Sequence, residues 1–97
     1  MKGKERAFLR SLANGIDPVV YIGKDGLTDA VIAQADEAIT ARELIKCKVQ
    51  DGALLTAREA CDELSAALNA EPVQTIGNRF VIYRRNPEKP AIVINAK

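Results

Sequence analysis

Histidine is absent from this 97-residue chain, and cysteine occurs only twice. Cys47 and Cys61 do not form a CxxC pair, so the sequence offers no zinc ligand set. Cys47 alternates with apolar residues in a predicted strand and Cys61 lies on an apolar helical stripe, which favours burial over a disulfide or a catalytic role. The chain also lacks the GxxxxGK[ST] pattern of a nucleotide-binding loop, and no two carboxylates have the spacing of a catalytic pair. We therefore expect no enzyme, no metal and no cofactor.

Long apolar segments are missing too. No stretch approaches the ~20 apolar residues that span a bilayer, and the basic start of the chain has no apolar signal core. Apolar residues at 47% and charged residues at 28% are ordinary values for a globular protein. The sequence thus predicts a single cytoplasmic domain over residues 1–97, in which residues 86–97 form a less regular tail.

Apolar periodicity and turn residues divide the chain into helices and strands. Helices are expected at 4–13, at 28–41 and along the apolar stripe at 57–68. Strands are expected at 19–22, 44–49, 73–76 and 79–84, the last two joined by a tight hairpin, and residues 91–95 could add an edge strand or pack as a tail. This order, α-β-α-β-α-β-β, predicts an α/β fold: a two-layer sandwich with three helices on one face of a four-stranded mixed sheet.

A GxxG loop joins the first strand to the second helix. Gly23, Lys24, Asp25 and Gly26 form the loop, and Thr28 can cap the helix that follows. Glycines let the main chain pass close to a ligand, amides at a helix start carry partial positive charge, and Lys24 adds a full one. This combination is typical of a phosphate site, for which nucleic acid is the obvious polyanion. An ordinary tight turn is the alternative that the motif alone leaves open.

The net charge of +1 conceals an uneven distribution. Basic residues predominate in 1–26 and 72–97, whereas acidic residues predominate in between and occupy the outer side of the third helix. If the fold brings both ends of the chain together beside Lys24, one face attracts phosphates despite the near-neutral total. The residues expected on this single cationic surface are Arg6, Arg10, Arg79, Arg84 and Arg85. Scattered solvated charges are the alternative reading.

Three separated blocks resemble a known family. PVVYIGKDGLT at 18–28, ARELIK at 41–46 and VQTIGNRFVIY at 73–83 are similar to the CRM domain, and above all to its stand-alone bacterial form, the YhbY family of ribosome-associated RNA-binding proteins. The resemblance runs from Lys4 to about Asn95. It implies a fold akin to the carboxyl-terminal domain of translation initiation factor three, with a loop like the GxxG loop by which KH domains clamp RNA backbone. It also implies association with precursor large ribosomal subunits.

Carried over by position, the family loop is Gly23 to Gly26, and its basic terminal strand corresponds to Arg79, Val81, Tyr83, Arg84 and Arg85. These residues lead to the hypothesis of an RNA-binding protein in ribosome assembly, in which backbone amides and Lys24 meet phosphates and the arginines extend the contact. Asp25 repels phosphate, so its side chain is expected to point to solvent or to pair with a neighbouring basic side chain.

Tyr21 or Tyr83 could stack on an unpaired base, but aromatic residues make up only 4% of the chain and packing is the favoured role. The alternative function is a protein-interaction module, whose open sheet face or final strand docks on a ribosomal protein or on a second copy. Lys46 and Lys48, opposite the core face of their strand, would then lie at the rim of that interface.

Overall fold

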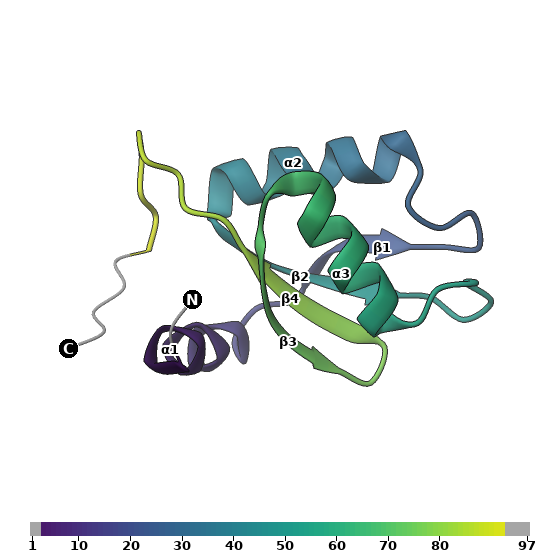
Figure 1. Ribbon diagram of the computed structural model, residues 1–97, viewed down its shortest axis with the longest axis horizontal. Helices are drawn as coiled ribbons and strands as arrows, with labels where there is room; N and C mark the ends of the chain where they lie inside the picture. Colours follow the sequence, from purple (N-terminus) through teal and green to yellow (C-terminus); the bar gives the residue numbers. More distant parts are fainter. Residues whose placement is uncertain (1–2, 93–97) are drawn as a thin grey trace.

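The computed structural model describes residues 3–92, and its elements follow the expected order (Figure 1). They are α1 (Gly3–Ala13), β1 (Pro18–Ile22), α2 (Asp29–Arg42), β2 (Leu44–Val49), α3 (Ala57–Leu68), β3 (Glu71–Ile76) and β4 (Arg79–Tyr83). The predicted α/β class and the element order are confirmed, with boundaries that move by no more than two residues. Of the possible strand at 91–95, Ala91 and Ile92 lie in no strand and the rest falls outside the described residues.

The four strands form one mixed sheet in the order β1-β2-β4-β3. β1 and β2 are parallel, and α2 supplies the crossover that a parallel pair requires. β4 runs antiparallel to both of its neighbours. The register places Ile22 beside Val49 and Leu44 beside Tyr83, so β1 and β2 finish at one end of the sheet and β4 finishes at the other.

The sheet buries residues on both faces. On one face, α2 and α3 cover a core that includes Val20, Ile45 and Phe80. On the other face, α1 packs Leu9 and Ala13 against residues of β2, β3 and β4, and Figure 1 shows α1 below the sheet with α2 above it. The sequence predicted all three helices on one face of the sheet. This prediction is wrong for α1, which lies on the opposite face from α2 and α3. The physical reason lies in β4, whose apolar run FVIY is buried on both sides.

Glu43 links the end of α2 to the segment after β4. Its backbone has φ 65°, and its side chain is fully buried. The carboxylate accepts hydrogen bonds from the amides of Asn86 at 2.5 Å and of Ala91 and Ile92 at 2.6 Å each. Burial alone would raise the pKa of Glu43, but these three amides and the charge of Arg85 outweigh it, so the pKa lies below its ordinary value. The irregular segment 86–92 is therefore held by a buried carboxylate.

Candidate nucleic-acid interface

The GxxG loop, residues 23–26, projects from the end of the sheet where β1 and β2 finish. The Gly23 carbonyl accepts a hydrogen bond from the Gly26 amide at 3.0 Å, and the Gly26 carbonyl accepts one from the Thr28 amide at 3.1 Å. These bonds close a tight turn whose central residues, Lys24 and Asp25, are exposed. Among the hydrogen bonds of residues 3–92, none uses the amides of Lys24 and Asp25. Both amides therefore lack an acceptor within the described part of the chain, and both residues are exposed.

The start of α2 lies directly beside this loop. The Thr28 hydroxyl accepts a hydrogen bond from the Val31 amide at 3.2 Å, which makes Thr28 the N-cap as the sequence predicted. The amides of Asp29 and Ala30 belong to the first turn, where the helix itself supplies no acceptor. A helix start carries roughly half a unit of positive charge, so loop and helix together form a site suited to an anion.

The fold requires glycine at one of the two glycine positions of the loop but not at the other. Gly26 has φ +73°, a conformation that side chains with a Cβ rarely adopt, so the turn itself requires glycine. Gly23 has no such φ, and a Cβ built there would lie 3.5 Å from Gln50 Oε1, an ordinary contact. Nothing in the described fold therefore demands glycine at position 23.

Arg84 and Arg85 lie far from the loop. Because Tyr83 pairs with Leu44, they follow β4 at the end of the sheet where β2 begins, whereas the GxxG loop lies where β2 finishes. The six residues of β2, at about 3.4 Å each, separate these ends by roughly 17 Å, about twice the screening length at physiological salt. The expectation that both ends of the chain gather around Lys24 on one surface is wrong for Arg84 and Arg85.

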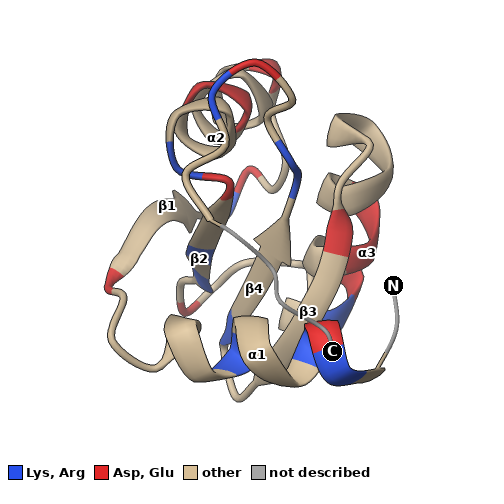
Figure 2. Ribbon diagram, turned by 90° about the vertical axis from the view of Figure 1, so that its left-hand side faces the viewer, with Lys and Arg blue, Asp and Glu red and all other residues tan. Residues whose placement is uncertain are grey.

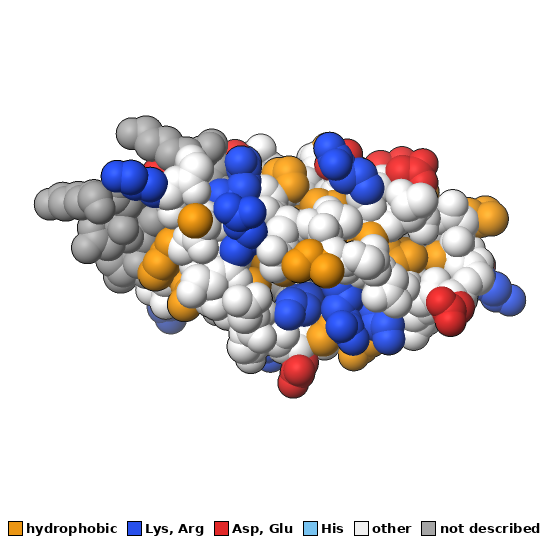
Figure 3. Space-filling model, turned by 90° about the horizontal axis from the view of Figure 1, so that it is seen from below, with side chains coloured by type: hydrophobic (Ala, Val, Ile, Leu, Met, Phe, Trp, Pro, Cys, Tyr) orange, Lys and Arg blue, Asp and Glu red, His pale blue; other side chains and the backbone are white. Residues whose placement is uncertain are grey.

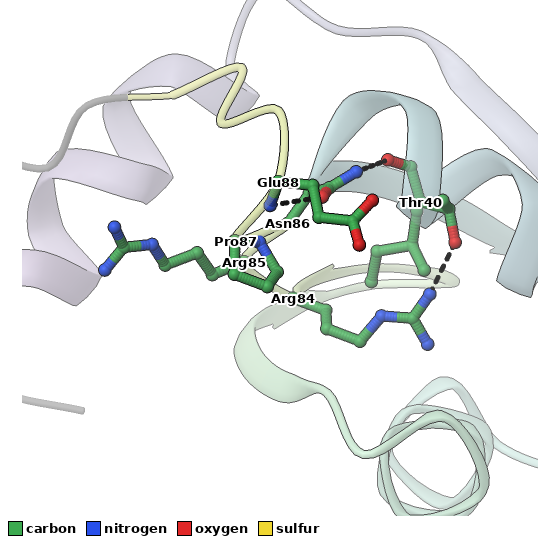
Figure 4. Close-up of a pocket in the computed structure, with 7 residues that line it drawn as sticks. Thr40, Arg84, Arg85, Asn86, Pro87 and Glu88 are labelled. Carbon is green, nitrogen blue, oxygen red and sulfur yellow. Dashed lines mark hydrogen bonds between the residues drawn. The ribbon is translucent and has the colours of Figure 1, made fainter.

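Arg84 is instead engaged within the fold. Its guanidinium contacts Asp36 Oδ1 at 2.8 Å and donates to Thr40 Oγ1 at 2.7 Å and to the Leu68 carbonyl at 3.0 Å. Figure 4 shows its side chain directed toward Thr40, while Arg85 extends to the opposite side. Arg84 therefore ties β4 to α2 and to the last turn of α3, where a cation also complements the helix dipole.

A different group of basic residues shares a surface with Arg79. Tyr21 pairs with Lys48, Lys48 pairs with Arg79 and Arg79 pairs with Ile76, so these four residues form a row across all four strands on the face that carries α1. Lys46 follows in the next row. We call the part of this face that α1 leaves uncovered the open sheet face; it consists of Tyr21, Lys46, Lys48, Gln74, Ile76 and Arg79. Figure 3 views the molecule from this side and shows Lys and Arg side chains gathered there beside apolar ones.

Helix α1 adds the remaining predicted arginines to this side. Arg6, Arg10 and Asn14 recur at four-residue intervals, which places them in one row along α1 and its end. Asn14 borders a groove of about 180 Å³ together with Lys46 and Arg79. Arg6 lines a separate hollow at the β3 edge, together with Gln74 and with Asp62 of α3. Arg79 therefore lies beside Lys46 and Lys48, which were expected at an interface rim only under the protein-interaction alternative. Helix α1, with Arg6 and Arg10, packs on the same face of the sheet, but Arg6 itself lies at the β3 edge near α3.

Helix α3 carries a group of acidic side chains, and one acidic residue, Glu5, lies on α1 itself. The outer side of α3 exposes Glu59, Asp62 and Glu63, as predicted. In Figure 2 the α3 ribbon carries red for acidic residues, whereas β2 and β4 carry blue for basic ones. Asp25 is exposed at the tip of the GxxG loop and forms no ion pair among residues 3–92.

The two tyrosines differ sharply in exposure. Tyr83 is 7% exposed beneath α1, and burial raises its pKa, so the packing role expected from the sequence is confirmed for this residue. Tyr21 is 48% exposed on edge strand β1 and is available to a ligand. Both tyrosines lie on the face that carries α1, so strand alternation does not distinguish the buried tyrosine from the exposed one. The difference in exposure depends on how far α1 extends over the sheet.

Both cysteines are free and buried, as predicted. Burial raises the pKa of Cys47 to about 12 and also raises that of Cys61, so neither thiol ionises readily at neutral pH. Within residues 3–92, no three His, Cys, Asp or Glu side chains are grouped as metal ligands. None of the helices in this part of the chain has the length and apolar character needed to cross a membrane.

The molecule is thus a small α/β domain in which a GxxG loop precedes the capped start of α2, and basic side chains lie on the sheet face that carries α1. Residues 1–84 match the model of the CRS1 / YhbY (CRM) domain. The chain belongs to this family, as its three sequence blocks indicated.

Proteins similar to this chain are found in several bacteria. It is 37% identical over 92 residues to "Probable RNA-binding protein YqeI" of Bacillus subtilis, a match that covers 95% of this chain and 96% of that protein. It is 38% identical to a Haemophilus influenzae protein named "RNA-binding protein", over 88% of this chain and 86% of the other. The solution structure of SAV1595 from Staphylococcus aureus superposes with a TM-score of 0.82 at 40% identity, covering 98% and 99% of the two chains.

Proposed function

We propose that this protein binds RNA, with the GxxG loop and the start of α2 as its primary contact. The observation that carries the proposal is the loop geometry: two adjacent amides without an internal partner, next to a helix start and an exposed Lys24. Gly23 supports it, because the fold tolerates a larger residue there while a close-fitting phosphate backbone would not. Membership in the CRM family, and relatives named as RNA-binding proteins, favour RNA as the anion.

The loop residues have separate roles in this proposal. The amides of Lys24 and Asp25 and those at the start of α2 donate to phosphate oxygens, and the Lys24 ammonium neutralises one phosphate. The Thr28 hydroxyl accepts from Val31 and retains its own hydrogen for a phosphate oxygen. Asp25 points to solvent, and Gly26 sets the turn.

Basic residues away from the loop extend the contact. Arg79, Arg6 and Arg10 lie on the side of the molecule that carries α1, where they attract further phosphates. Arg84 acts through the fold, because its donors already have internal acceptors. Arg85 lies at the far end of the sheet, outside the primary contact.

The proposed RNA is ribosomal RNA in precursors of the large subunit, and the proposed role is in assembly of that subunit in the cytoplasm. The resemblance to the stand-alone bacterial YhbY form supports this assignment, since that form is ribosome-associated. The activity is binding without chemistry. The high pKa values of both thiols agree with this, because neither cysteine offers a ready nucleophile.

Matched variants test the site. Lys24→Gln removes a charge from the loop, and Arg85→Gln removes the same charge at the other end of the sheet. In titrations of ribosomal RNA fragments at several salt concentrations, wild type should show a falling affinity, and Lys24→Gln should lower the log–log slope by about 0.7. Arg85→Gln should leave the slope unchanged. Equal effects of the two variants, or an affinity independent of salt, would contradict the loop as the primary contact.

The cellular partner is tested separately. A tagged protein is sedimented from bacterial extract, and RNA crosslinked to it is sequenced from each fraction. The proposal expects the protein in fractions that contain large-subunit precursors, with crosslinks to their ribosomal RNA. Recovery only among free proteins would remove the ribosomal assignment, while the RNA titrations would still decide whether the loop binds RNA.

A further inference from the structure

The open sheet face presents one ring and two cations in a single row. Tyr21, Lys48 and Arg79 come from β1, β2 and β4, which are adjacent in the sheet. Neighbouring strands are about 4.8 Å apart, so the row from Tyr21 to Arg79 spans roughly 10 Å. Helix α1 does not cover this row, because its contacts lie over Leu44, Val81 and Tyr83 toward the other end of the sheet.

The residues that form the open sheet face include three cations and no carboxylate. Ion pairs within residues 3–92 join Arg58 to Asp62 and Arg84 to Asp36, and none involves a cation of the open sheet face. The strand residues on this face are basic, amide or apolar. A surface of this composition is complementary to a polyanion rather than to another protein with ordinary mixed charge.

Tyr21 gives the face a means to contact bases as well as phosphates. Its side chain remains half exposed although it lies between two strand residues of the core, Val20 and Ile22. An aromatic ring on an open sheet, flanked by cations, is an arrangement on which unpaired bases stack. Ile76, 64% exposed at the other end of the row, adds an apolar boundary.

The open sheet face adjoins the end of the sheet from which the GxxG loop projects. Tyr21 precedes Gly23 by two residues of extended chain, a distance of about 7 Å. We propose that the open sheet face binds an unpaired segment of the same RNA, with one base stacked on Tyr21 and the flanking phosphates on Lys48 and Arg79. This inference rests on the proposed RNA-binding function and deepens it, because it selects single-stranded RNA over duplex RNA. In a duplex, the base faces are stacked on one another and are not available to Tyr21.

The test compares an oligouridylate of about ten nucleotides with an RNA duplex of equal length. Tyr21→Leu should weaken binding of the oligouridylate by about 5- to 100-fold and leave the duplex affinity unchanged, while Tyr21→Phe should bind both as wild type does. Lys48→Gln and Arg79→Gln should each lower the salt slope for the oligouridylate by about 0.7. Circular dichroism melting checks that each variant is folded.

A spectroscopic readout addresses stacking directly. The chain has two tyrosines and no tryptophan, so in a Tyr83→Phe background the intrinsic fluorescence reports Tyr21 alone. Stacking should quench this fluorescence as the oligouridylate saturates the protein. Unchanged fluorescence at saturation, or a folded Tyr21→Leu variant with wild-type affinity, would overturn the inference.

The remaining outcomes separate this inference from the function on which it rests. If wild type binds ribosomal RNA fragments but not the oligouridylate, the open sheet face is not a single-strand site and the proposed function stands. If wild type binds no RNA, both are wrong. If Tyr21→Leu binds RNA normally but loses self-association in sedimentation equilibrium, the face is an interface between copies, and the inference fails.

Discussion

Replacement of Gly23 by alanine separates a glycine required by the fold from one required by a ligand. The added Cβ would lie 3.5 Å from Gln50 Oε1, which needs no rearrangement, and the backbone at Gly23 has no positive φ. Alanine also reduces the freedom of the unfolded chain, which stabilises a protein by about 0.4–1 kcal/mol where the native backbone allows it. Gly23→Ala should therefore leave the free energy of unfolding unchanged or raise it slightly.

The neighbouring glycine gives the opposite expectation for stability. At φ +73° an alanine costs about 1–2 kcal/mol, partly offset by the same unfolded-state effect, so Gly26→Ala should destabilise the protein by about 1 kcal/mol. In a domain of this size, 1 kcal/mol corresponds to a fall in Tm of about 4–8 °C. Thermal melts followed by circular dichroism measure both differences.

Both variants should lose RNA affinity, for different reasons. In Gly23→Ala the new methyl group obstructs the approach of the phosphate backbone, and the loss of one hydrogen bond to a charged group, about 1.5–3 kcal/mol, corresponds to a loss of about 10- to 100-fold. Gly15→Ala, another glycine with space and no positive φ, lies near the start of β1 and serves as the control. A stable Gly23→Ala protein with wild-type affinity in fluorescence anisotropy would refute close backbone contact at the loop.

Three other predictions concern the fold. Arg84→Ala should destabilise the protein by about 1–2 kcal/mol in urea titrations, because four acceptor atoms on Asp36, Thr40 and Leu68 lose their donor. Arg85→Ala should change stability by less than about 0.5 kcal/mol, and equal effects of the two variants would contradict the role of Arg84 in linking β4 to the helices. The pKa of Glu43 is lowered in the folded state, so the stability that its carboxylate contributes is present above its ordinary pKa of 4.5 and is lost as the pH falls through the lowered value. Glu43→Gln should cost about 2–4 kcal/mol at pH 7, and the free energy of unfolding of this variant should depend less on pH in the acid range. Cys47, with its pKa raised to about 12, should react with a thiol reagent only at the rate of global unfolding, and fast labelling of the native protein would show that the site is open.

Secondary structure could be predicted from the sequence because its signals are local. The alternation in LIKCKV, the cap at Thr28 and the Gly77–Asn78 turn depend on residues within a few positions of one another. The same holds for the GxxG loop, which lies between a strand and a helix as expected. The family resemblance extended this local reading to the whole fold.

The side of the sheet that α1 covers was not predictable in the same way. An amphipathic helix must bury its apolar stripe, but the stripe does not state against which face. The run FVIY in β4 carried a hint, since a strand with apolar residues at successive positions is buried on both faces. This pattern predicts that both faces of the sheet are covered, but it does not identify the helix that covers the second face.

The sequence by itself determined the elements, the GxxG loop, the buried cysteines and the acidic outer side of α3, because each depends on spacing along the chain. Only the tertiary structure decided which charges lie together. The strand order and the antiparallel direction of β4 carry Arg84 and Arg85 away from Lys24, and they align Lys48 with Arg79 and Tyr21. Distances between charges follow from pairing between remote segments, and that pairing depends on the packing of the whole sheet against its helices.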